Sequence, residues 1–119
     1  MAGLMDLARE LGQGLGRTDE YQALRRAISA ADDDRDLVEA RNGLLEIEQR
    51  IAQIVREGQE PGSDIAEEYD GAVNRLQALA GYQRLVAAQA NFDKFMARVN
   101  EAITQGMDEV GVSRIVIPS

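Results

Sequence analysis

The stretch that decides the fold lies near the middle of the chain and reads Arg35-Asp36-Leu37-Val38-Glu39-Ala40-Arg41-Asn42-Gly43-Leu44-Leu45-Glu46-Ile47-Glu48-Gln49-Arg50-Ile51-Ala52-Gln53-Ile54-Val55-Arg56-Glu57. Its apolar residues alternate three- and four-residue steps, at Leu37, Ala40, Leu44, Ile47, Ile51 and Ile54. This spacing predicts an amphipathic helix that packs against another helix. The apolar face is widened by Val38, Leu45, Ala52 and Val55. A face this wide favours contact with more than one neighbour.

A short loop follows this helix. Gly58 is expected to end the helix, Pro61 with the next glycine to form a turn, and Ser63 or Asp64 to cap the next helix. Apolar residues then recur at helical spacing over residues 65–80. Because the loop is short, we expect the two flanking helices to pack antiparallel as a hairpin.

The first third of the chain also has helical spacing. Residues 4–16 and the piece from Thr18 to about Ala31 each have an apolar side, and the glycines between them leave open one bent helix or two short ones. Thr18 is a predicted N-cap. One of Asp32, Asp33 and Asp34 is expected to cap the central helix.

The last long helix is predicted from about Tyr82 to Met107, after a kink or tight turn at Gly81. The chain is therefore expected to be all-α, an antiparallel helical hairpin or bundle of four or five helices. Residues 1–110 are predicted to form a single domain, and residues 111–119 an apolar C-terminal tail.

The composition narrows the function. A net charge of −8, with 13 basic residues scattered among 21 acidic ones, disfavours direct nucleic-acid binding, which needs a basic face. The chain has no cysteine and no histidine, so zinc, iron–sulfur and haem sites built on these ligands are excluded within one chain, as are Cys and His catalytic pairs.

The remaining polar motifs have structural explanations. Asp32, Asp34 and Asp36 alternate as in a calcium loop, but the glycine and glutamate that such a loop needs at its sixth and twelfth positions are replaced by Leu37 and Gly43. Neighbouring carboxylates and the i,i+4 pair of Glu46 and Arg50 are expected to be surface features. Glycines 12, 14 and 16 follow a helix rather than a strand, so they do not form a dinucleotide-binding loop. We predict no catalytic residue, no cofactor and no metal site, and no enzyme.

The two ends of the chain give further expectations. The N-terminus does not read as a signal peptide and no stretch has the ~20 apolar residues of a membrane span, which predicts a cytoplasmic protein without membrane insertion. The tail has a β-forming motif, made of Val112, Ile115, Val116 and Ile117. It is interpreted as disordered, as pairing with its counterpart in an oligomer, or as a motif that adds a strand to a partner.

Two patterns far apart in the chain carry a family resemblance. The first is Asp19-Glu20-Tyr21-x-x-Leu24-Arg25-x-Ala27. The second is Asn91-Phe92-x-x-Phe95-Met96-x-x-Val99-Asn100-x-x-Ile103. In this order, with the Glu60-Pro61 loop between them, they resemble the YlbF/YmcA family of small all-helical bacterial proteins. The resemblance extends from about Met5 to Met107.

The resemblance implies a non-enzymatic adaptor or regulator that self-associates through its long helices as a homodimer or higher oligomer. The best-known members form a complex with sister family members and influence a membrane-anchored endoribonuclease that processes bacterial mRNA, and thereby competence, biofilm formation and sporulation. The implied partners are the protein itself, sister proteins or a ribonuclease. Some members bind an iron–sulfur cluster through cysteines, which this chain does not have.

The residues that are candidates for a protein interface are Tyr21, Leu24, Phe92, Phe95, Met96, Val99 and Ile103. The alternative is that they form the core of the bundle. A competing function is that of an accessory or cargo protein docked to a larger assembly through its tail. The small secreted helical-hairpin proteins are disfavoured because their Trp-x-Gly turn needs a tryptophan, which this chain does not contain.

Overall fold

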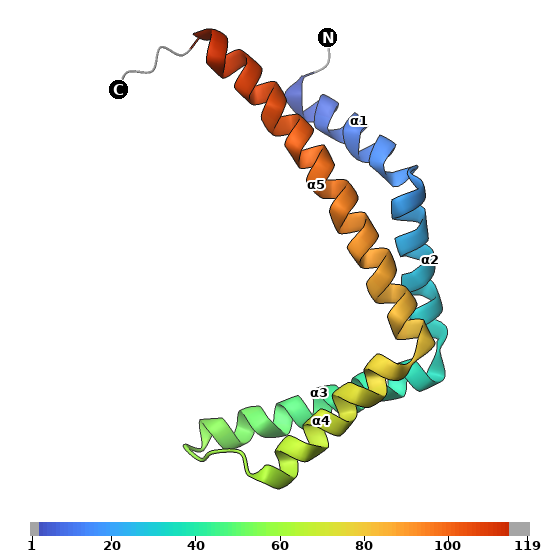
Figure 1. The fold of residues 1–119 in the computed structure, drawn as a ribbon, viewed down its shortest axis with the longest axis vertical. Coiled ribbons are helices and arrows are strands. Elements are labelled where there is room, and N and C mark those ends of the chain that lie inside the picture. The colour runs from blue at the N-terminus through green and yellow to red at the C-terminus, as the bar shows by residue number, and fades with distance from the viewer. Residues whose placement is uncertain (1–2, 115–119) are drawn as a thin grey trace.

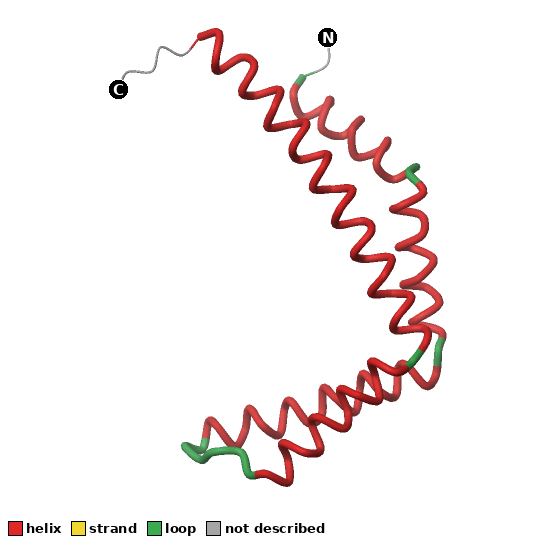
Figure 2. Tube along the Cα trace, in the orientation of Figure 1, coloured by secondary structure: helices red, strands yellow, loops and turns green. Residues whose placement is uncertain are grey.

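The computed structural model describes residues 3–114, and those residues form five α-helices joined by short connections (Figure 1). The helices are α1 (Leu4–Gly16), α2 (Asp19–Asp33), α3 (Arg35–Arg56), α4 (Ser63–Ala78) and α5 (Ala80–Arg114). Figure 2 shows helix and loop, and no strand, over this described part of the chain. The predicted all-α fold is confirmed.

The molecule is extended and bent into two limbs. In the long limb, α2 packs along α5 and α1 continues beyond α2; in the hairpin limb, α3 and α4 pack against each other (Figure 1). The described chain extends over 61 × 40 × 22 Å with a radius of gyration of 21.8 Å. A compact domain of this length has a radius of about 13.5 Å. Much of each limb is therefore open to solvent.

The core lies at the elbow, where the two limbs meet. Its buried side chains are Ala31, Leu37, Ala40 and Leu76, and the half-buried ones packed on them are Leu44, Leu79, Tyr82 and Leu85. The chain crosses the elbow twice, each time through a single residue with extended backbone: Asp34 between α2 and α3, and Leu79 between α4 and α5. Because both joints are single residues beside the same core, they limit the angle at which the two limbs can meet.

Gly81 fits α5 into this elbow. A Cβ atom at Gly81 would lie 2.7 Å from Oδ2 of Asp34 and 3.2 Å from Cδ1 of Leu37. The absence of a side chain therefore lets the first turn of α5 approach the start of α3 closely.

The predicted helix caps at the start of α2 and α3 are confirmed. The Thr18 hydroxyl accepts a hydrogen bond from the Tyr21 backbone N–H at 3.2 Å. The Asp34 carboxylate accepts one from the Leu37 backbone N–H at 3.2 Å. Each cap satisfies a donor that the first helical turn leaves free.

Three expectations about helix ends are corrected. The first segment is two short helices, one of the two alternatives, but they part at Arg17 and Thr18, and the glycines expected to follow the first helix lie within α1. Helix α4 starts at Ser63, so its N-cap is Gly62 rather than Ser63 or Asp64, and glycine is well tolerated at that position.

The third correction concerns α5, which begins at Ala80, before Gly81, and runs on to Arg114 rather than ending near Met107. Glycine in a helix interior costs only about 1 kcal/mol, and no proline lies between Ala80 and residue 118, so nothing stops this helix earlier. The backbone of Val112 is thus helical. Ile115, Val116 and Ile117 of the predicted tail motif lie outside the described residues.

None of the helices in the described chain combines the length and the apolar character needed to cross a membrane.

Candidate functional site

The candidate interface residues are gathered in the long limb, where most of them join α2 to α5. Leu24 is buried, with 6% of its surface exposed. The rings of Tyr21 and Phe92 pack at a centroid distance of 5.7 Å and an angle of 58°. Edge-tilted aromatic contacts of this kind are favourable. This part of the predicted set therefore holds the limb together.

The remaining candidates follow α5 outward from that contact. Phe95, Met96 and Val99 are half-buried, whereas Ile103 is 45% exposed. The guanidinium of Arg98 lies 5.7 Å from the centroid of the Phe95 ring, within the range of a cation–π contact. Among these candidates, Ile103 is thus the one that is exposed.

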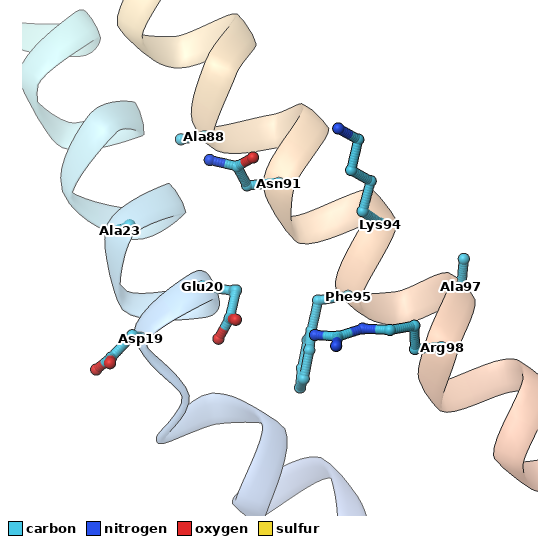
Figure 3. Close-up of a pocket in the computed structure, with 9 residues that line it drawn as sticks. All are labelled: Asp19, Glu20, Ala23, Ala88, Asn91, Lys94, Phe95, Ala97 and Arg98. Carbon is cyan, nitrogen blue, oxygen red and sulfur yellow. The ribbon is translucent and has the colours of Figure 1, made fainter.

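A groove lies between α2 and α5, and its wider part has a volume of about 700 Å³ (Figure 3). The lining residues are Asp19, Glu20, Ala23, Ala88, Asn91, Lys94, Phe95, Ala97 and Arg98. In Figure 3, Asn91 points from α5 towards α2, and the Phe95 ring extends into the space between the two helices.

A second hollow of about 450 Å³ continues this groove towards the elbow. It shares Ala23, Ala88 and Asn91 with the first. Its further lining residues are Arg26, Ala27, Ala30, Gly81, Arg84 and Ala87. We call the two hollows together the α2–α5 groove. Its apolar lining is mostly alanine, with one aromatic ring.

The charged groups of the groove are mainly basic. Arg26, Arg84, Lys94 and Arg98 line it, against the acidic pair Asp19 and Glu20 at the start of α2. The ion pairs among the described residues engage other arginines, which are Arg9, Arg41, Arg50 and Arg75. In a chain with a net charge of −8, this gathering of positive charge is local to the groove.

The free end of the long limb exposes a second apolar surface. On α1 its residues are Leu4, Leu7 and Leu11, which are 75%, 52% and 43% exposed. On α5 they are Ile103, Met107 and Val110, which are 45%, 63% and 58% exposed. We call these six side chains the apolar end. Where exposed apolar side chains form a contiguous patch, they mark surfaces that bind other proteins.

Two of the aspartates around the elbow have structural partners. Asp34 caps α3, and Asp32 lies 3.9 Å from the guanidinium of Arg41. No group of three or more potential metal-ligating side chains comes together among the described residues.

Reasoning from the sequence missed the groove, although a signal for it was present. On α5 the lining residues follow the alternating three- and four-residue spacing of a helix seam, at Gly81, Arg84, Ala88, Asn91, Phe95 and Arg98. On α2 the same spacing holds for Glu20, Ala23, Ala27 and Ala30. Two matching stripes on helices that pack together indicate a continuous trough.

Comparison with known proteins places this chain in a family. Residues 4–108 match the family described as control of competence regulator ComK, YlbF/YmcA. A UPF0342 protein of Staphylococcus saprophyticus is 23% identical over 90% of this chain and 94% of its own length. A UPF0342 protein of Oenococcus oeni is 24% identical over 92% of this chain and 96% of its own length. A UPF0342 protein of Staphylococcus haemolyticus is 25% identical over 90% of this chain and 94% of its own length.

Proposed function

This chain belongs to the YlbF/YmcA family, and we propose that it is a non-enzymatic helical adaptor that self-associates and binds other proteins. The family description as a regulator of competence supports a regulatory role. Fold alone is weak evidence of a shared task, so the proposal depends on the surfaces of this molecule.

The observation that carries the proposal is the apolar end of the long limb. Leu4 and Met107 are 75% and 63% exposed, and side chains of this size gain about 1.5–3 kcal/mol when fully buried. Covering the apolar end with another protein chain would therefore supply a substantial free energy of association. A second copy offers such a cover, because the same surface on two copies can pair about a two-fold axis.

The proposed regulatory target is a bacterial RNA-processing complex that contains an endoribonuclease. In this proposal the protein acts on that complex through protein contacts, since its net charge of −8 opposes binding to RNA along most of its surface. The proposed location is the cytoplasm.

Sedimentation equilibrium tests self-association directly. The variants Leu7→Asp and Met107→Asp place a charge in the apolar end, and we expect them to sediment as monomers while the unaltered chain sediments as an oligomer. Val55→Asp is the matched control, because Val55 is 57% exposed but lies in the hairpin limb. A monomeric unaltered chain at high concentration would contradict the proposal.

The partner claim needs a separate test, in which purified sister proteins and the endoribonuclease are titrated with the full chain. A variant ending at Arg114 keeps all of α5 and omits the five residues that follow. Binding that survives in this variant supports the adaptor. Loss of all partner binding in it would instead favour docking through the tail.

A further inference from the structure

We infer that the α2–α5 groove is the docking site for an amphipathic helix of a partner protein, whose apolar stripe is flanked by acidic residues. This inference rests on the proposed function as an adaptor and names the chemistry of its partner. It concerns the groove, whereas the proposed self-association concerns the apolar end.

The shape of the groove fits a helix. Its α5 wall runs from Gly81 to Arg98, about 18 residues, which is roughly 27 Å of helix or five turns. Both walls are helices whose backbone groups are bonded internally, so the groove offers no sheet edge to which an extended peptide could add a strand. An incoming helix needs no such edge, because its own backbone is already satisfied.

The lining determines how closely that helix can approach. Ala23 and Ala88 lie where the two hollows of the groove join, and their short side chains leave room for a third helix to seat its own larger residues. The ring of Phe95 extends into the groove and offers an aromatic surface for one of those residues (Figure 3). Aromatic side chains are common anchors in protein interfaces.

Charge selects the kind of helix. Arg26, Arg84 and Lys94 are exposed and take part in none of the ion pairs within the described chain. Arg26 and Arg84, on the two walls of the trough, complement glutamates or aspartates that flank an apolar stripe, whereas Lys94 extends from α5 away from α2 (Figure 3). Near Asp19 and Glu20, at the opposite end from the elbow, the same logic favours a lysine or arginine on the incoming helix.

The apolar lining also argues for a protein rather than a nucleic acid. Arg98 lies against the Phe95 ring, and Glu20 extends from α2 towards the same groove, where its carboxylate would repel a phosphate backbone (Figure 3). An acidic helix matches both the trough and the cations beside it.

The probes are two helix-stapled peptides of about 18 residues, a length set by the groove. They share one leucine and alanine stripe but carry either glutamate or lysine beside it. Fluorescence anisotropy with the full chain measures the Kd of each peptide at low and high salt. We expect the Kd of the acidic peptide to be at least about tenfold lower than that of the basic one, and to rise as the salt concentration rises.

Adjacent arginines on α2 provide a matched pair of variants. Arg26 lines the groove and Arg25 does not, and both are exposed. Arg26→Glu is expected to raise the Kd of the acidic peptide about tenfold, and Arg25→Glu to change it less than about twofold. Circular dichroism checks that both variants keep their helix content.

Several outcomes would overturn the inference. Equal affinity for the two peptides, no binding up to millimolar concentration, or equal effects of the two arginine variants would each do so. Binding of a single-stranded RNA with the same sensitivity to Arg26→Glu would reassign the groove to nucleic acid. An Arg26→Glu chain that becomes monomeric would assign it to a second copy. Failure of self-association at the apolar end would leave the peptide result unaffected, so the two proposals fail separately.

Discussion

The hairpin limb and the long limb use similar amphipathic helices but bury them to different extents. In the hairpin limb, α3 buries Ile47 in addition to its elbow residues Leu37 and Ala40, and ion pairs join Arg50 to Glu68 and Arg75 to Glu39 across the two helices. In the long limb, α5 is the longest helix at 35 residues, yet none of its described side chains is fully buried.

This difference locates the surface that is available for other molecules. The hairpin limb pairs charges across its two helices, although Leu45 and Val55 on α3 stay exposed. The long limb leaves a basic groove along α2 and α5 and an apolar end beyond them. We therefore expect changes near the elbow to affect the stability of both limbs, and changes farther out to separate the behaviour of one limb from that of the other.

The largest effect is expected where the limbs are joined. Leu37 is 0% exposed, so Leu37→Ala leaves a cavity at the elbow and should lower the free energy of unfolding by about 2–5 kcal/mol. Urea denaturation followed by circular dichroism measures this loss. Leu45→Ala, on the same helix at 51% exposure, should change it by less than about 0.5 kcal/mol. Equal losses would show that the elbow core is not formed as described.

A smaller effect is expected from adding one methyl group to α5, and its sign should depend on the position. At Gly106 an added Cβ atom would have no neighbour within 4 Å, so Gly106→Ala should stabilise α5 by about 0.5–1 kcal/mol, as alanine usually does in a helix. Gly81→Ala displaces the Asp34 carboxylate from its capping position, which costs about 1 kcal/mol. Thermal unfolding should therefore separate the two variants, and equal midpoints would mean that the close approach at the elbow is absent.

The third prediction concerns the long limb alone. A double-mutant cycle with Tyr21→Leu and Phe92→Leu should give a coupling of about 0.5–1.5 kcal/mol, because the two rings are in contact. The same cycle with Tyr69→Leu in place of Tyr21→Leu should be additive within about 0.5 kcal/mol, since Tyr69 lies in the hairpin limb. Denaturant unfolding supplies all the free energies. A coupled Tyr69 cycle would argue against separate limbs.

The smallest effect is expected in the hairpin limb. Arg50 and Glu68 are 48% and 50% exposed, so Glu68→Gln should cost no more than about 1 kcal/mol, and less at high salt. Glu48→Gln on the outer surface of α3 is the comparison. Chemical denaturation at two salt concentrations measures both variants. A loss above 2 kcal/mol would mean that ion pairing, rather than packing, holds this limb together.

The sequence predicted what depends on neighbours along the chain. The apolar spacing of α3 placed Leu37 on its packed face, Thr18 was identified as a cap, and the cap of α3 was narrowed to three aspartates, of which Asp34 is the one. These features depend on helical periodicity and on the nearest turn, which a single sequence displays directly.

What the sequence did not predict depends on contacts between distant segments. Arg50 was expected to pair with Glu46 one turn away but pairs with Glu68 on α4. Gly81 read as a break in the helix, whereas its role comes from the approach of Asp34. The groove likewise needs Arg26 and Lys94 on two helices that come together only when the chain bends back at the elbow.

The two single-residue joints at the elbow also imply an order of assembly. The α3–α4 hairpin closes across a short loop, which costs little chain entropy. Once it forms, the joints at Asp34 and Leu79 hold the C-terminal end of α2 beside the N-terminal end of α5. Contacts between α2 and α5 can then form turn by turn away from the elbow, up to the contact of Tyr21 with Phe92. The apolar end lies beyond that contact, so it is the part of the long limb that the two joints constrain least.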